Sequence, residues 1–225
     1  MNRFNIFNQV HKGLRAMLYN MALTIQHTDF SKEEEGKATL RKLKHVLELY
    51  AEHGQHEDTH VFPAVKEASP AAVAALEAEH EKDEQLVNDL LLQIRAYKNA
   101  DATHKAAIGY GIHISFQEFV AFNLQHMSKE EKTINPVLWQ HYTDDEIAAI
   151  QRSIVRNISP ESNMYYTRWM LRGMNDAEIS AWFRKVKETA PTEVWNGLWL
   201  ISIDELGYER TTALAPRQVG VAAIY

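Results

Sequence analysis

The chain has 225 residues, no cysteine and a formal net charge of −6 at pH 7. The lack of cysteine excludes disulfides, thiolate metal sites and cysteine nucleophiles, so any metal must be held by nitrogen and oxygen ligands. The sequence has no basic run and no apolar run long enough to span a bilayer, and we expect neither a nucleic-acid nor a membrane partner. No signal peptide is visible, which predicts a cytoplasmic location by default.

Apolar residues recur every three or four positions from residue 4 to about residue 141, a spacing that predicts helices with one buried face. The first helix is expected to stop near Thr28-Asp29, and Ser69-Pro70 has the features of a helix start. After the first helix, the other three are expected at about 32–67, from 70 to the linker at 99–101, and at about 102–129. Pro63 lies inside the second long helix, where it predicts a kink or a break.

Beyond Asn135-Pro136 the pattern changes to shorter units whose starts are rich in acidic residues. Three or four short helices are predicted between about 144 and 206, and the segment from Gly207 has no periodicity, which predicts an extended or frayed tail. The predicted fold class is therefore all-α, an up-down four-helix bundle followed by a small C-terminal group of short helices. We place the bundle at 1–141 and the extension at 142–225.

A histidine interrupts the apolar stripe of each long helix. These four residues are His11, His53, His80 and His126; Glu57 and His60 continue the stripe of the second helix, and Glu130 continues that of the fourth. Neighbouring helices of an up-down bundle run antiparallel, and counting residues from the connecting loops brings these positions to nearly the same height. They are expected to form one polar layer inside the bundle.

A polar layer in an apolar bundle needs a common partner, because a buried carboxylate without one is costly. A metal ion would be that partner. Histidine and glutamate four residues apart lie on one helix face and can grip the same ion or two adjacent ions. This spacing occurs at His53 with Glu57 and at His126 with Glu130. With His11 and His80 the set has four imidazoles and two carboxylates, which suit iron or manganese, with zinc possible.

Several neighbouring residues leave alternatives open. His60 shares the face of Glu57 and stays open as a ligand, whereas His56 is expected to lie beside the site or in solvent. Glu84 follows His80 at the histidine–glutamate spacing and is expected to be a solvated surface acid. The other histidines are expected on the surface or in packing: His27, His45, His104, His113 and His141.

The order of these motifs resembles the hemerythrin-like (HHE cation-binding) family over residues 1 to about 140. The residues that carry the resemblance are His11, the stretch from His53 to Glu57 that continues DTHVFP, His80 in EAEHEKD, and His126 with Glu130. The resemblance implies a four-helix bundle with a non-haem di-iron centre, in which Glu57 and Glu130 bridge two iron ions and the histidines cap them. Two iron ions are therefore the expected cofactor, with manganese or zinc as the lesser alternatives.

Two departures separate this sequence from the oxygen-carrying hemerythrins. Those have a His-x-x-x-His pair on the third helix, whereas here Glu84 follows His80 at that spacing, and His60 is the candidate to replace the missing imidazole. Oxygen carriers also have a carboxylate five residues after the fourth-helix histidine, a spacing that Glu131 holds. Glu130 repeats the spacing of His53 and Glu57, so we favour Glu130 and leave Glu131 as the alternative.

The resemblance and the ligand set together favour a protein that binds, senses or stores dioxygen or a related ligand such as nitric oxide. A di-iron enzyme or iron-handling protein is the alternative, acting in peroxide or nitric oxide reduction or in iron donation for cluster repair. A third reading is a structural bundle whose polar layer holds zinc or only hydrogen bonds. The sequence leaves open both the question of enzymatic activity and the identity of any protein partner.

Overall fold

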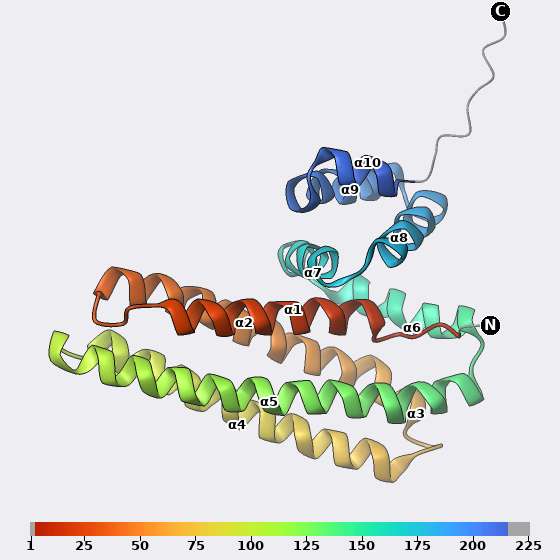
Figure 1. Cartoon of the computed structure of the whole chain (residues 1–225). Helices are drawn as coiled ribbons and strands as arrows, with labels where there is room; N and C mark the ends of the chain where they lie inside the picture. Colours follow the sequence, from red (N-terminus) through yellow and green to blue (C-terminus); the bar gives the residue numbers. More distant parts are fainter. Residues whose placement is uncertain (1–2, 216–225) are drawn as a thin grey trace, which may run out of the picture.

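The computed structural model describes residues 3–215, and this range is helical without a strand (Figure 1). The predicted all-α fold class is confirmed. In chain order the helices are α1 (Asn8–His27), α2 (Glu33–His56), the π-helical η1 (Glu57–Val61), α3 (Phe62–Val65), α4 (Pro70–Asn99), α5 (Ala102–His141), α6 (Asp144–Asn157), α7 (Pro160–Gly173), α8 (Asp176–Thr189), α9 (Thr192–Leu206) and α10 (Tyr208–Leu214).

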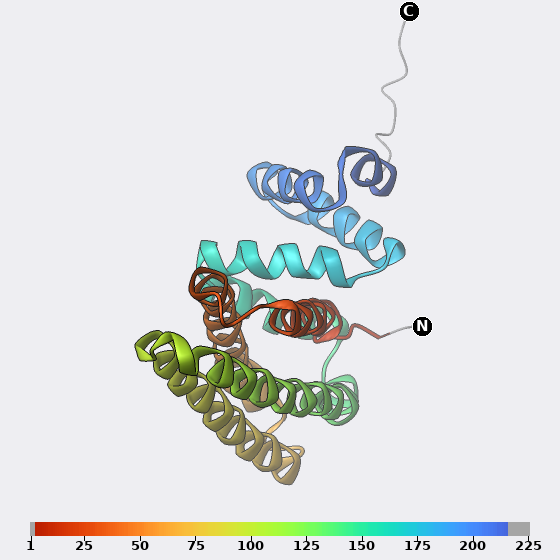
Figure 2. The same ribbon diagram turned by 60° about the vertical axis from the view of Figure 1, so that its left-hand side comes forward.

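The long helices α1, α2, α4 and α5 form an antiparallel bundle, and the later helices lie on its α1 side (Figures 1 and 2). Each bundle helix has an apolar face with the three-and-four spacing, and these faces meet in one core. Its fully buried members include Leu18, Leu43, Leu47, Phe116 and Phe119. A second apolar cluster closes the end of the bundle near Phe7 and Phe62. The polar layer lies between these two clusters and is shielded on both sides.

The second bundle helix contains a π turn just before Pro63. Proline lacks an N–H and its ring excludes the carbonyl four residues back, which disfavours regular α-helix at this point. The chain responds with η1, in which the N–H of Phe62 donates to the carbonyl of Glu57 five residues earlier. The predicted kink or break is therefore a local widening of one helix, and α3 continues directly from it. Glu57 is the first residue of this wide turn.

Helix α5 is longer than the sequence pattern predicts, since it passes through Pro136 and ends at His141 instead of near 129. Ile134 and Leu138 flank this proline and are fully buried in the second apolar cluster. The Trp139 indole N–H also donates to the carbonyl of Phe4 at 2.8 Å. This packing continues the helix beyond the proline, so the predicted end near 129 is wrong.

The C-terminal helices dock on α1 through a close approach of two backbones. A Cβ atom added at Gly173 of α7 would lie 2.3 Å from the carbonyl oxygen of Lys12, and one added at Gly13 of α1 would lie 2.8 Å from the amide nitrogen of Met170. Neither position has room for a larger residue. Lys12 also pairs with Glu178 at 2.5 Å, which ties α1 to α8. The helix α1 is thus packed between the bundle and the C-terminal helices.

Helices α8 to α10 form a small third core together with Leu171 of α7. Phe183 and Ile179 of α8 are fully buried in it, and Leu198 of α9 is buried beside them. Tyr208–Leu214 is helical, and the Thr211 hydroxyl donates to the carbonyl of Ser202 at 3.0 Å. The expectation of an extended tail from Gly207 is therefore wrong for this segment, while its part at 216–225 lies outside the described residues. The division of the chain at 141 stays a prediction.

Within residues 3–215, every helix falls short of the combined length and apolarity that crossing a bilayer requires.

The close α1–α7 contact makes a stability prediction. Gly173→Ala places a Cβ against main-chain atoms that cannot swing away, so we expect the variant to lose about 1–3 kcal/mol of unfolding free energy. The matched control is Gly197→Ala in α9, where no atom lies within 4 Å of the new Cβ and we expect a gain of roughly 0.5–1 kcal/mol. Urea unfolding of both variants measures the difference. Equal effects would contradict the packing of α7 on α1.

Candidate metal centre

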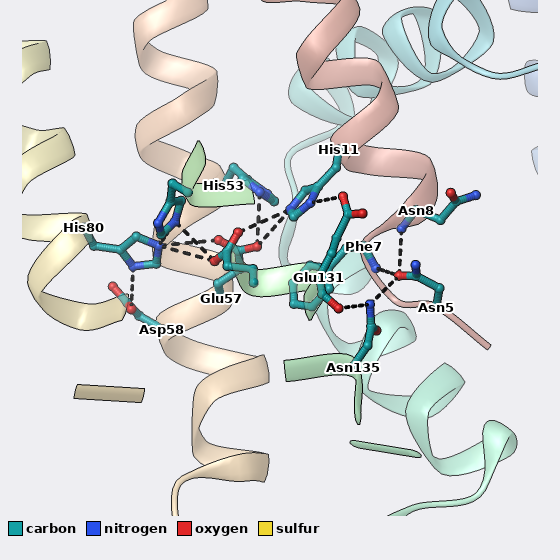
Figure 3. Close-up of polar contacts among 12 residues, drawn as sticks. Asn5, Phe7, Asn8, His11, His53, Glu57, Asp58, His80, Glu131 and Asn135 are labelled. Carbon is teal, nitrogen blue, oxygen red and sulfur yellow. Dashed lines mark hydrogen bonds and ion pairs between the residues drawn. The ribbon is translucent and has the colours of Figure 1, made fainter. Parts of the chain in front are cut away.

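Six of the seven predicted site residues come together inside the bundle. Figure 3 labels four of them, His11, His53, Glu57 and His80. Each of the six contributes one ligand atom, and the atoms of each group lie within 4.8 Å of one another. The first group contains His11, His53, Glu57 and Glu130, and the second contains Glu57, His80, His126 and Glu130. The histidines come from all four bundle helices, as their positions on the apolar stripes predict. Two groups that share both carboxylates could hold a pair of metal ions.

Glu57 reaches both groups with its two carboxylate oxygens. Oε1 lies 3.1 Å from Nε2 of His53 and 3.4 Å from Nε2 of His11. Oε2 lies 3.5 Å from Nε2 of His80 on the other side. The carboxylate therefore lies between the two histidine pairs, which is the arrangement of a bridging ligand.

Glu130 repeats the arrangement from the fourth bundle helix. Its Oε2 lies 3.5 Å from Nε2 of His11, and its Oε1 lies 3.2 Å from Nε2 of His126 and 3.8 Å from Nε2 of His80. Glu130 is fully buried and Glu57 is 2% exposed. Both carboxylates thus extend from the first histidine pair, His11 and His53, to the second pair, His80 and His126.

Several ligand atoms at the centre lack a hydrogen-bond partner among the described residues. They are Oε2 of Glu57, both oxygens of Glu130 and Nε2 of His53. Buried polar atoms in native proteins are nearly always satisfied, and an unpaired buried carboxylate costs several kcal/mol. Divalent cations at the two groups would satisfy all of these atoms at once. The residues present therefore fit a pair of metal ions.

The far nitrogen of His11 faces an acid outside the centre. Its Nδ1 donates to Oε1 of Glu131 at 2.9 Å, and that oxygen also accepts from the Arg15 guanidinium at 2.8 Å. Glu131 therefore orients His11 and lies outside both ligand groups. Glu130 is the carboxylate inside them, in agreement with the spacing argument that favoured it over Glu131. A bond of this kind fixes the ring and leaves Nε2 free to face the centre.

An acid also orients the ring of two further histidines through their Nδ1 atoms. Nδ1 of His80 donates to Asp58 at 2.8 Å, and Nδ1 of His126 donates to Glu79 at 2.8 Å. Glu79 also accepts from Lys129 at 2.6 Å. Sequence reasoning missed Asp58 and Glu79, because their pairing depends on how neighbouring helices are rotated. Their positions beside Glu57 and His80 in the sequence were the only available signal.

Phenylalanine rings cover the outer faces of three histidines. Phe7 stacks on His11, Phe62 on His80 and Phe122 on His126, with ring centroids 4.8, 5.3 and 6.0 Å apart. Such flat apolar contacts limit ring rotation and lower the local dielectric. The imidazoles are therefore held both at their far nitrogens and on their faces.

Charge at the centre is strongly coupled. Burial disfavours the protonated form of His11, but the bonds from Glu131 and Glu57 outweigh it and raise its pKa to about 9. Burial opposes protonation of His80 too, and Asp58, Glu130 and Glu57 together raise its pKa to about 12. Burial alone would raise the pKa of Glu57, yet the adjacent imidazoles hold it well below its usual value. Without a metal, protons on the histidines compensate the buried carboxylates.

His60 does not join the centre. Its Nδ1 lies 3.1 Å from the Ser153 hydroxyl of α6, and it belongs to neither ligand group. Residues in a π turn advance by a smaller angle than in an α-helix, so His60 leaves the face of Glu57 although it follows by only three residues. The structure therefore places His60, which the sequence left open as a ligand, outside both ligand groups. His56 faces Glu52 at 3.6 Å and is also outside, and Glu84 is exposed as expected.

Comparisons with known proteins place the bundle in a family of cation-binding domains. The sequence model of the hemerythrin HHE cation-binding domain matches residues 2–138. Among curated proteins, the F-box/LRR-repeat protein 5 of Xenopus laevis is 21% identical over 173 residues, which cover 76% of this chain and 24% of that protein. The chain thus spans about a quarter of the length of this relative. No solved structure matches the chain.

The exclusion of His60 predicts a difference between two histidine variants. His53→Ala removes an imidazole whose Nε2 lies 3.1 Å from Glu57, so we expect it to lose at least one metal ion per chain. His60→Ala is the control, seven residues further along the chain, and we expect it to retain the wild-type metal content. Metal analysis of both purified variants decides the point. Metal loss in His60→Ala with retention in His53→Ala would show that the ligand set is misassigned.

Metal uptake should also release protons. In the metal-free chain the raised pKa values of about 9 for His11 and about 12 for His80 keep both rings protonated at pH 7. Imidazole must be neutral to bind a metal, so we expect about two protons to leave per chain and the apparent affinity to rise with pH between 6 and 9. Calorimetric titration with ferrous ion in buffers of different ionisation enthalpy measures the release. A binding heat independent of the buffer would contradict it.

Proposed function

The chain belongs to the hemerythrin HHE cation-binding family, and we propose that its two ligand groups hold two iron ions that bind, sense or store dioxygen or nitric oxide. One observation carries the proposal. Glu57 and Glu130 each present one oxygen toward the His11 side and the other toward the His80 side. Shared carboxylates of this kind support two ions held close together, as opposed to a single ion.

The donor set supports iron as the metal. It consists of imidazole nitrogens and carboxylate oxygens, in a chain without cysteine. Nitrogen and oxygen ligands projecting from the facing helices of a bundle suit iron and manganese pairs, whereas a structural zinc site would be tetrahedral and closed. Manganese and zinc are therefore the lesser alternatives. Bound ferrous ions would supply electrons to a small ligand, one from each ion.

The protein's own groups would prepare the centre for such a ligand. Each ligand group supplies two imidazoles and two carboxylate oxygens, a set that leaves positions open on iron. The outer carboxylates Glu131, Asp58 and Glu79 keep the rings turned so that Nε2 faces inward. Stacked phenylalanines and the buried side chains around them restrict entry of water.

The third bundle helix argues for sensing or transient storage over stable carriage. His80 is the only residue of this helix in the two ligand groups, and the exposed Glu84 stands at the spacing where an oxygen carrier has a further imidazole. His60 does not supply a replacement, because it bonds Ser153. Four imidazoles therefore serve two ions. With fewer imidazole ligands per ion than in a centre with five histidines, we expect each ion to be lost or oxidised more readily.

The decisive experiment is metal analysis combined with the visible spectrum of the protein produced in iron-rich medium. We expect about two irons per chain, as two ligand groups require. Oxygen should generate a charge-transfer band that disappears on deoxygenation, and nitric oxide should bind the reduced protein. Iron content well below two would remove the di-iron proposal. Rapid irreversible oxidation, or turnover of peroxide, would favour the enzymatic alternative.

A pair of glutamate variants tests the bridge. Glu57→Ala removes the carboxylate between the histidine pairs and is expected to release at least one iron. Glu84→Ala removes an exposed acid that follows His80 by four residues and should retain full occupancy. Full retention of iron in Glu57→Ala would mean that the bridge is placed wrongly.

A further inference from the structure

A second polar layer lies one helical turn from the proposed ligands. Tyr50 precedes His53 by three residues, Asp83 follows His80 by three, and Asn123 precedes His126 by three. Three residues correspond to about 4.5 Å along a helix. Because α2 and α5 both run antiparallel to α4, these offsets point the same way along the bundle, toward the loops at 28–32 and 100–101 (Figures 1 and 2). The second layer therefore borders the metal centre on that side.

Asp83 and Asn123 are held together across two helices. The Asn123 side chain is 3% exposed, and its Nδ2 donates to Oδ1 of Asp83 at 2.6 Å and to the carbonyl of Phe119 at 3.1 Å. The pair is built into the bundle and has a fixed geometry. The Tyr50 hydroxyl is then the polar group of this layer that has no hydrogen-bond partner among the described residues.

Tyr50 differs from the other deeply buried tyrosines. It is 3% exposed, its ring packs edge-on against Phe119 with centroids 5.4 Å apart, and its hydroxyl has no hydrogen-bond partner in residues 3–215. The hydroxyls of Tyr97 and Tyr166 instead donate to main-chain carbonyls at 2.9 and 2.6 Å. A buried hydroxyl without a partner costs stability, and native proteins rarely tolerate one without a reason.

The electrostatics link Tyr50 to the centre. Burial raises the pKa of the Tyr50 phenol well above its usual value, and the nearby Asp83 raises it further. Burial also raises the pKa of Asp83, while Asn123 and the imidazoles of the centre act against that rise. The charge of Asp83 therefore acts both on Tyr50 and on the imidazoles of the centre. The phenol keeps its proton and is therefore available as a hydrogen-bond donor.

We propose that Tyr50 donates a hydrogen bond to a diatomic ligand at the metal centre, with Asp83 and Asn123 forming the fixed polar wall beside it. This inference rests on the proposed function, since it needs a centre that holds the ligand. A diatomic such as dioxygen or nitric oxide gains negative charge on binding and offers an acceptor atom. The unpartnered hydroxyl would then find its partner only in the ligand-bound protein.

The proposal predicts opposite effects on stability and on binding for the same substitution. Tyr50→Phe removes a hydroxyl that has no partner in the metal-free chain, so we expect its Tm to stay equal to that of the wild type or to rise. Tyr97→Phe is the matched control at the far end of the bundle. It breaks a bond to the carbonyl of Phe30 and should lower the Tm. A clear fall in Tm for metal-free Tyr50→Phe would overturn the premise that the hydroxyl is unpaired.

The binding test uses nitric oxide and the iron-loaded protein. We expect Tyr50→Phe to release nitric oxide about tenfold faster than the wild type, the loss of one hydrogen bond to a charged acceptor, and Tyr97→Phe to release it at the wild-type rate. The N–O stretching frequency should shift in deuterated solvent in the wild type and not in Tyr50→Phe. Wild-type release rate and solvent shift in Tyr50→Phe would overturn the role of Tyr50 alone. A wild type that holds neither iron nor nitric oxide would overturn the proposed function as well.

Discussion

The burial of two carboxylates at the centre of an apolar bundle is the constraint on which the rest of the structure depends. Glu57 and Glu130 are both removed from water, and each could be accommodated only with positive charge close by. Four imidazoles supply it as protonated rings or as ligands of cations. Their far nitrogens must then be held in turn, and this requirement accounts for the acids Glu131, Asp58 and Glu79 around the centre. The polar network is ordered outward from the carboxylates.

Helix α1 connects this network to the remainder of the chain. It contributes His11 to the first ligand group, and Arg15 one turn later pairs with Glu131 of α5. On its other side the backbones of α1 and α7 come together at Gly13 and Gly173. The position of His11 is therefore set by packing on both faces of one helix. A displacement of α7 would therefore move α1 and, with it, the proposed ligand His11.

The bundle and the polar layer were predictable because their signals are local. The recurrence of apolar residues identifies the helices, and the four-residue spacing of His53 with Glu57 and of His126 with Glu130 places ligands on one face. What failed depends on tertiary context. Helix α5 continues past Pro136 because Leu138 is buried, and His60 leaves the site because of the π turn. The pairing of Glu79 with His126 needs the rotation of two helices, which a single sequence does not contain.

The chain topology of the centre has a mechanical consequence. One ligand group joins residue 11 of the first bundle helix to residue 130 of the last, so a single ion would close almost the entire bundle into a loop. A cross-link over so long a segment restricts the unfolded chain strongly, since the entropy of loop closure grows with the number of residues enclosed. Secreted domains obtain such cross-links from disulfides. In a chain without cysteine, the ion would act as a reversible cross-link that is lost when the metal is removed.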